Sequence, residues 1–197
     1  MKGNAGLSEH LPQAVRPPGT LPRLLPAGAS PASLAGHLAR YGPPPVGLGQ
    51  RQRESLIAEV ARAGLTGRGG AGYPTARKLG AVAAGRAPVV LANGTEGEPA
   101  SAKDKVLMTR SPQLVLDGAV LAAEMVGARQ AVIVVHPAAR RIIDDAVAEQ
   151  ARARFDQVRI RVCTASERFV AGQASAVVHW IEQGVPAPTA SPPRVSE

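Results

Sequence analysis

Helical and strand-like patterns alternate between residues 54 and 183, and this alternation restricts the fold more than any other feature of the sequence. Helical patterns are expected over residues 54–64, 74–85, 111–127, 137–155 and 172–183. Strand-like runs separate them at 87–92, 130–135 and 158–163. The alternation predicts an α/β fold, in which a mostly parallel sheet is covered by helices and a ligand binds at the carboxyl ends of the strands.

Local signals refine two of these elements. Ser101 and Asp104 have the spacing of a capping box and predict the start of a further short helix. Pro74 suits the first turn of the helix that follows it. In the helix over 111–127, the residues expected to face inward are Leu114, Val115, Ala119, Ala122 and Val126.

The length of 197 residues and the 45% hydrophobic content suit one sizeable core with flexible ends. We expect a globular domain over residues 51–185, preceded by a flexible leader over 1–50 and followed by a flexible tail over 186–197. Nine of the 18 prolines precede residue 50, a composition that favours extended chain.

The formal net charge of +8 raises the question of a nucleic-acid partner. Six basic residues and one acidic residue precede Glu54, so this segment carries +5 of the total. Aromatic residues make up only 3% of the chain, which leaves few rings for bases to stack on. A specific nucleic-acid module is therefore not expected, although a basic interaction module for an acidic partner stays open as a minor alternative.

The segment GLTGRGGAGYPTARK, from Gly64 to Lys78, contains a G-x-G-x-x-G spacing at Gly67, Gly69 and Gly72. A dinucleotide fingerprint requires a strand before the first glycine, whereas the pattern here is helical, so an ordinary Rossmann motif is not favoured. Glycines still allow main-chain N–H groups to approach a phosphate closely. A second segment, VVLANGTEGEP, is expected to bring polar residues to one rim from the end of a strand, and together the two indicate a pocket for a phosphorylated cofactor.

These two segments, followed by AKDKVLM, DGAVLAAEMVGARQAVIVV and ERFVAGQASAVVHWIEQG, occur in the same order and spacing in a known family. From about Glu54 to Gly184 the chain resembles the flavin-binding 51 kDa subunit of respiratory complex I and its relatives among NAD-linked hydrogenases and formate dehydrogenases. The N-G-x-E-x-E-P variant is also similar to that of membrane-bound ferredoxin–NAD oxidoreductases.

The resemblance implies a Rossmann-like domain that binds FMN and accepts a hydride from NADH, with no side-chain nucleophile. Lys78 is implied as a positive charge near the flavin, and the ring of Tyr73 as a platform for adenine. By motif position, the implied FMN contacts are Gly67, Arg68, Gly69, Gly72, Lys78, Asn93, Thr95, Glu96 and Gly172, and the implied NADH contacts are Tyr73 and Glu98.

The sequence departs from the family pattern at the nucleotide site. Thr95 stands where the family has an aspartate that contacts flavin, and Gln173 and Ala174 stand where it has two glutamates, beside the retained Gly172. A non-catalytic or degenerate scaffold of the same family is therefore the alternative function. In that alternative, the glycines form only a tight turn, and Lys78 is an exposed helix charge.

A single cysteine, Cys163, cannot hold an iron–sulfur cluster and is expected as a buried, inert thiol in the strand over 158–163. His136 and His179 are interpreted as packing or surface residues rather than metal ligands. The sequence given ends at Glu197, before the ubiquitin-like and cluster-binding segments of the family, which indicates a truncated or minimal flavin domain. Electrons would then pass to a separate iron–sulfur or electron-acceptor subunit.

No apolar run reaches membrane-spanning length, and the first residues lack the apolar stretch of a secretory signal. We expect a cytoplasmic protein without membrane insertion, either free or peripheral to a membrane complex.

Overall fold

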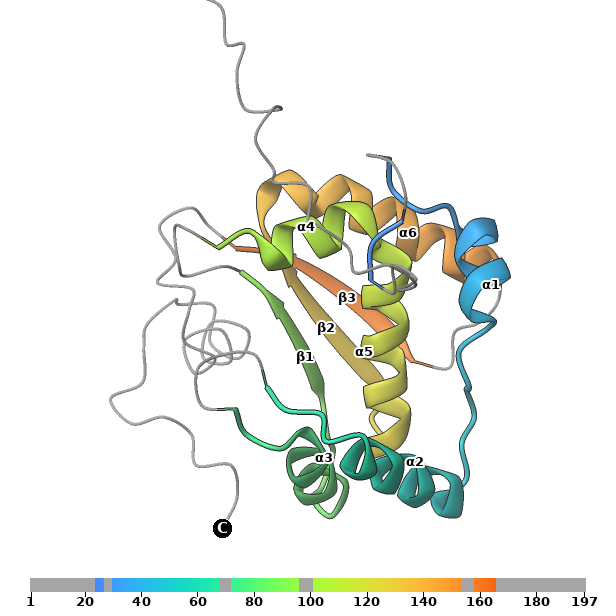
Figure 1. Cartoon of the computed structure of the whole chain (residues 1–197), viewed down its shortest axis with the longest axis vertical. Helices are drawn as coiled ribbons and strands as arrows, with labels where there is room; N and C mark the ends of the chain where they lie inside the picture. Colours follow the sequence, from blue (N-terminus) through green and yellow to red (C-terminus); the bar gives the residue numbers. More distant parts are fainter. Residues whose placement is uncertain (1–23, 27–29, 68–71, 96–100, 154–157, 166–197) are drawn as a thin grey trace, which may run out of the picture.

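The computed structural model describes residues 24–26, 30–67, 72–95, 101–153 and 158–165. Three parallel strands form its sheet in the order β1-β2-β3, namely β1 (Val90–Gly94), β2 (Gln130–Val135) and β3 (Arg159–Thr164) (Figure 1). The α/β fold and the parallel sheet predicted from the sequence are confirmed. Cα register pairs Val90 with Ala131 and Gln130 with Arg159, so all three carboxyl ends lie at the same edge.

The helices of the domain follow the predicted order. They are α2 (Gln50–Arg62), α3 (Thr75–Ala83), α4 (Lys103–Arg110), α5 (Pro112–Val126) and α6 (Arg140–Arg152), with a short 3-10 helix at Pro137–Ala139. Gly64 and Gly127 follow α2 and α5 with φ of 63° and 74°, the left-handed backbone in which a glycine commonly ends a helix. The helix predicted over 172–183 and the tail over 186–197 lie outside the described residues.

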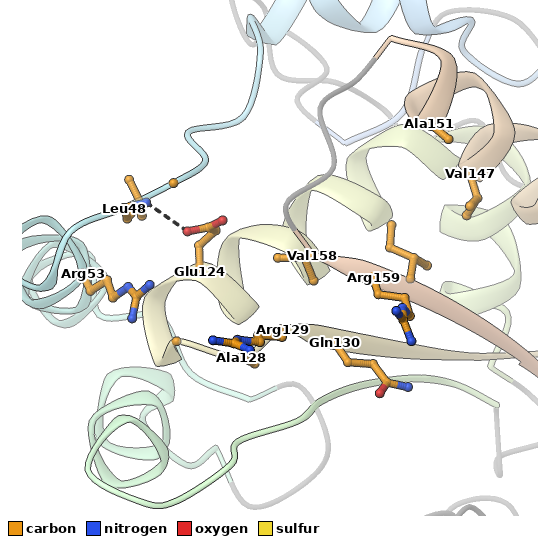
Figure 2. Close-up of a pocket in the computed structure, with 13 residues that line it drawn as sticks. Leu48, Arg53, Glu124, Ala128, Arg129, Gln130, Val147, Ala151, Val158 and Arg159 are labelled. Carbon is orange, nitrogen blue, oxygen red and sulfur yellow. Dashed lines mark hydrogen bonds between the residues drawn. The ribbon is translucent and has the colours of Figure 1, made fainter.

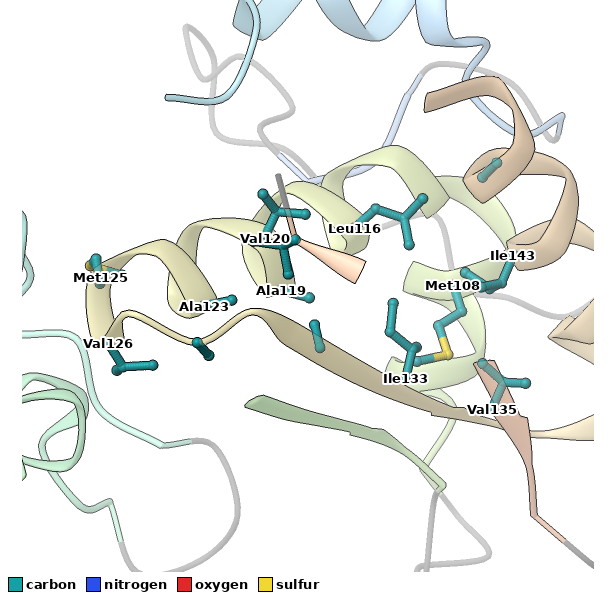
Figure 3. Packing of buried hydrophobic residues seen from close by; sticks show 14 of the residues in the cluster. Met108, Leu116, Ala119, Val120, Ala123, Met125, Val126, Ile133, Val135 and Ile143 are labelled. Atoms are coloured by element: carbon teal, nitrogen blue, oxygen red, sulfur yellow. The ribbon is translucent and has the colours of Figure 1, made fainter. Parts of the chain in front are cut away.

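The hydrophobic core lies between one face of the sheet and the helices. Ala131, Ile133 and Val135 alternate along β2 and pack with side chains of α4, α5 and α6 (Figure 3). Leu116 and Ile143 are fully buried there, from α5 and α6 respectively. Val132 and Val134, on the other face of β2, are also buried and belong to a second, smaller cluster. Burial of both faces explains why β2 is a continuous apolar run and why its bounds are predicted correctly.

The inward face predicted for α5 is correct only in part. Ala119 and Val126 are buried as predicted, but Leu114, Val115 and Ala122 are half-buried. Other α5 residues are buried more fully, and these include Leu116, Val120 and Ala123. The helix is therefore rotated relative to the predicted face.

Two predicted starts are wrong. β1 begins at Val90 rather than residue 87, because Ala87 has a positive φ of 48° and Pro88 has no N–H to donate to a neighbouring strand. The capping box predicted at Ser101 and Asp104 is absent: Ala102 is the N-cap of α4, without a side-chain cap, and Asp104 instead accepts a hydrogen bond from Lys103 Nζ at 2.6 Å.

Residues 34–41 form a further helix, α1 (Leu34–Tyr41), which differs from the flexible chain predicted over 1–50. Ser33 caps it by accepting a hydrogen bond from the Gly36 amide. His37, only 2% exposed, places Nε2 at 2.6 Å from Asp117 Oδ2 on α5. Gln150 Nε2 on α6 donates to the other oxygen of Asp117 at 2.9 Å. This polar cluster fixes α1 to the domain.

Candidate functional site

The carboxyl edge of the sheet carries the polar groups nearest to the predicted ligand site. β1, β2 and β3 end at Gly94, Val135 and Thr164 (Figure 1). Arg140 Nη1, from the start of α6, donates to Thr164 Oγ1 at 2.9 Å, and its Nε donates to Asp144 at 2.6 Å. The arginine therefore links α6 to the end of β3.

Asn93 and Thr95 form a closed local unit at the end of β1. Asn93 Oδ1 accepts two hydrogen bonds from Thr95, from the main-chain N–H at 3.1 Å and from Oγ1 at 2.6 Å. Because a main-chain N–H can only donate, these contacts fix the side-chain oxygen of Asn93 toward Thr95. The amide Nδ2 remains as the donor that Asn93 could offer to a ligand.

Gly94 lies between these two residues and permits very close packing. A Cβ at this position would overlap Met108 Cε and Sδ on α4 and would lie 2.9 Å from the carbonyl oxygen of Val134. The glycine thus holds β1 tightly against both α4 and β2.

The glycine turn between α2 and α3 is closed at its base like a hairpin. Gly67 N–H donates to the Tyr73 carbonyl at 2.9 Å, Thr75 N–H donates to the Leu65 carbonyl at 2.9 Å, and Thr66 and Pro74 form an antiparallel bridge. The Gly67 amide is therefore engaged within the turn. Gly72, with φ of 57°, adopts a backbone that side chains disfavour, so glycine is required there for the turn itself.

The first turn of α3 is basic. Thr75 begins this helix, and Arg77 and Lys78 follow within its first four residues, both exposed and without an acidic neighbour in that turn. Positive side chains at a helix amino terminus face the positive end of the helix dipole, an arrangement that a nearby anion would stabilise. Tyr73 precedes this turn and is 45% exposed.

The predicted site residues thus lie on two separate supports. Asn93 and Thr95 extend from β1, whereas Gly67, Gly72, Tyr73 and Lys78 lie between α2 and the first turn of α3, which packs on α2 and α5. The remaining predicted residues lie outside the described part of the chain, and these are Arg68, Gly69, Glu96, Glu98 and Gly172, together with Gln173 and Ala174.

Sequence reasoning missed Arg140 and Thr164 at this edge. A signal for Thr164 was present, since it is a polar residue at the end of a predicted strand, but the pairing with Arg140 depends on the fold. His136, which follows β2, is exposed, and its Nδ1 accepts a hydrogen bond from the Ala138 amide at 3.2 Å. This agrees with a surface residue rather than a ligand.

Two further features bear on cofactors. Cys163 is a free thiol but only half-buried, so the fully buried side chain predicted for it is not observed. Within the described ranges, no three His, Cys, Asp or Glu side chains gather in a way that could hold a metal ion. The described helices also include none that is both long and apolar enough to cross a membrane.

Comparisons with known proteins connect this edge to a family. Residues 60–197 match the family model described as the Nuo51 FMN-binding domain. A subunit of the NADH-quinone oxidoreductase of Aquifex aeolicus is 28% identical over 71% of this chain and 36% of its own length. The alpha subunit of the NAD-reducing hydrogenase HoxS of Cupriavidus necator is 31% identical over 71% of this chain and 26% of its own.

A solved structure agrees in fold as well as in sequence. The crystal structure of an NAD⁺-reducing [NiFe]-hydrogenase in the air-oxidized state superposes with a TM-score of 0.65 at 32% identity, covering 73% of this chain and 26% of the hydrogenase chain. The chain thus spans about a third or less of the length of these relatives. The family model covers both the glycine turn and the end of β1, and the protein belongs to the Nuo51 FMN-binding domain family.

Proposed function

We propose that this chain binds FMN at the carboxyl edge of the sheet, accepts electrons from NADH there and passes them to a separate iron–sulfur or electron-acceptor subunit. The observation that carries the proposal is the match to the FMN-binding family, which extends over the glycine turn, β1 and β2. Bound FMN would supply the hydride acceptor, and the chain would hold and orient it.

The glycine turn and the first turn of α3 fit a phosphate group. Exposed Lys78 and Arg77 at the amino end of α3 offer positive charge beside main-chain donors. Because the Gly67 N–H is already bonded to Tyr73, the main-chain donors to a phosphate would come from Arg68, Gly69 and the residues after them rather than from Gly67. Gly67 acts instead by closing the turn.

The end of β1 offers neutral donors rather than charge. Asn93 would present its Nδ2 to the flavin, and Thr95 holds the Asn93 side chain in that orientation. Glu96 and Gly172 complete the proposed flavin contacts. The exposed ring of Tyr73 would stack on the adenine of NADH, and Glu98 would contact the same nucleotide.

The partner proposal follows from the relatives and from the single thiol. The two relatives are named as a subunit of NADH-quinone oxidoreductase and as a subunit of an NAD-reducing hydrogenase. With Cys163 as its one cysteine, this chain does not provide the set of thiolates that an iron–sulfur cluster takes. The electron exit would therefore lie on another chain.

The first prediction concerns flavin binding. The full chain, purified and incubated with FMN, should become yellow with a stoichiometry near one, and NADH added under anaerobic conditions should bleach the colour. Lys78→Gln should weaken FMN binding by roughly tenfold, because it removes a charge-assisted contact to phosphate. Arg62→Gln, an exposed charge on α2, should leave the affinity unchanged and serves as the control. A chain that stays colourless at saturating FMN would contradict the proposal.

A non-catalytic scaffold is the second candidate function. Thr95, Gln173 and Ala174 replace three carboxylates of the family's nucleotide site, which favours loss of NADH oxidation before loss of the fold. The same spectra separate the two candidates. A chain that binds FMN but is not bleached by NADH supports the scaffold, whereas rapid bleaching supports the oxidoreductase.

A further inference from the structure

A cavity of about 1090 Å³ opens at the amino ends of β2 and β3, at the sheet edge opposite to Asn93 (Figure 2). Gln130 and Arg159 are the first residues of these strands and line it. Leu48, before α2, and Val147, on α6, line two further sides. The cavity is therefore separate from the proposed flavin site.

Positive charge dominates its described lining. Arg53, Arg129 and Arg159 contribute three guanidinium groups, and Glu124 contributes one carboxylate. Glu124 is only 5% exposed, and its Oε2 accepts a hydrogen bond from the Leu48 main-chain amide at 3.1 Å. This carboxylate is thus turned toward the segment before α2 (Figure 2).

Three backbone relations bring the arginines together. A Cβ at Gly127 would lie 2.6 Å from Arg53 Nη1, so the guanidinium of Arg53 covers the glycine that ends α5. Arg129 is two residues further along the chain, and its carbonyl oxygen accepts the main-chain N–H of Arg159 at 2.9 Å. The three arginines therefore follow one another along the rim, although they come from distant parts of the sequence.

Arg53 has an unsatisfied donor at this place. Its Nε is buried and has no hydrogen-bond partner in the described part of the chain. Buried polar atoms are normally paired, and a guanidinium is suited to oxyanions because its donors form a planar fork. The end of α5 accounts for the position of Arg53, since a cation is favourable beside a helix carboxyl terminus, but it does not account for Arg129 and Arg159 on the same rim.

The remaining wall is apolar. Val147 and Ala151 of α6 face Val158 and Ile160 across the cavity. A concave site of this size with apolar walls and a few convergent charged groups is typical of small-molecule binding. We propose that this cavity binds a small, multiply charged oxyanion, either a polyphosphate or a polycarboxylate, through Arg53, Arg129 and Arg159.

Calorimetric titration of the full chain tests this site. Inorganic pyrophosphate and citrate are titrated separately, each in excess FMN so that any phosphate site in the glycine turn is already filled. Saturable binding of one anion per chain is expected for at least one of the two probes, and the probe that binds more tightly identifies the class. Absence of saturable binding by both would overturn the proposal, whether or not the chain binds FMN.

Two matched double variants assign the binding to this rim. Arg129→Ser with Arg159→Ser should weaken anion binding by about tenfold or more, because each arginine contributes charge-assisted hydrogen bonds. Arg141→Ser with Arg161→Ser removes the same charge from exposed positions outside the cavity and should leave the affinity unchanged. Equal losses in both variants would mean general charge attraction and would overturn the site. Thermal unfolding of each variant checks that the fold is retained.

Discussion

Gly94 is the residue at which sequence, packing and the proposed site meet. It lies between Asn93 and Thr95, and the space that a side chain would need is filled by Met108 of α4 and by the Val134 carbonyl of β2. Its role is therefore steric. The orientation of Asn93 depends on this close approach, since β1 is held at the distance that a missing Cβ allows.

The second prediction follows from this contact. Gly94→Ala should lower the free energy of unfolding by about 1–3 kcal/mol, because either Met108 or the neighbouring strand must move to admit the methyl group. Urea denaturation followed by circular dichroism measures the change. Gly118→Ala is the control, since Gly118 lies inside α5 with no atom within 4 Å of an added Cβ. This control should stabilise the chain by about 0.5–1 kcal/mol, and equal effects of the two substitutions would contradict the steric explanation.

Only part of the site was predictable at the scale of single residues. Asn93 at a strand end and Lys78 after a glycine turn could be identified from pattern, because strand ends and glycine spacing are local features. The hydrogen bonds from Thr95 to Asn93 and the engagement of the Gly67 amide by Tyr73 could not. They depend on backbone geometry that residue type alone does not determine.

At the scale of elements, α1 was the helix that the sequence did not predict. Its attachment to the domain depends on polar residues, His37 with Asp117, that are 80 positions apart. Hydrophobic periodicity detects faces that pack on a core, so a helix held by a buried polar cluster gives a weak signal. By contrast β2, apolar on both faces, was predicted with correct bounds.

The third prediction tests this attachment. Asp117→Ala should cost about 1–3 kcal/mol of unfolding free energy, because it leaves the buried ring of His37 without its partner and removes the acceptor of Gln150. Asp145→Ala on α6 is the control, since its side chain is 73% exposed and its nearest contact to Arg141 is 3.8 Å. That control should change stability by less than about 0.5 kcal/mol. Similar small effects in both would mean that the polar cluster does not hold α1.

At the scale of the whole molecule, one core connects nearly every described element. Side chains from α2, α3, α4, α5 and α6 meet one face of the sheet, and Leu116 is at 0% exposure within this cluster. The fold class was predictable because the alternation of helices and strands leaves few arrangements that bury both kinds of apolar face. The rotation of α5 was not, because it depends on how several helices share one surface.

The fourth prediction follows from this shared core. Leu116→Ala should lower the unfolding free energy by about 2–5 kcal/mol and should shift the whole unfolding curve rather than one part of it. Leu65→Ala, at a leucine that is 49% exposed beside the glycine turn, should have a much smaller effect. Circular dichroism and amide hydrogen exchange, recorded on the same samples, would contradict a single core if they gave separate transitions.

The contact between Gly94 and Met108 also limits how this protein can diverge. A smaller residue at position 108 would make room for a methyl group on the side of α4, so substitutions at the two positions should accumulate as pairs in descendants of this gene. The Val134 carbonyl stands 2.9 Å from the same point and belongs to the main chain, so no exchange of side chains can relieve it. Compensation can therefore remove only one of the two obstacles, and lineages that keep this strand spacing should keep glycine at position 94.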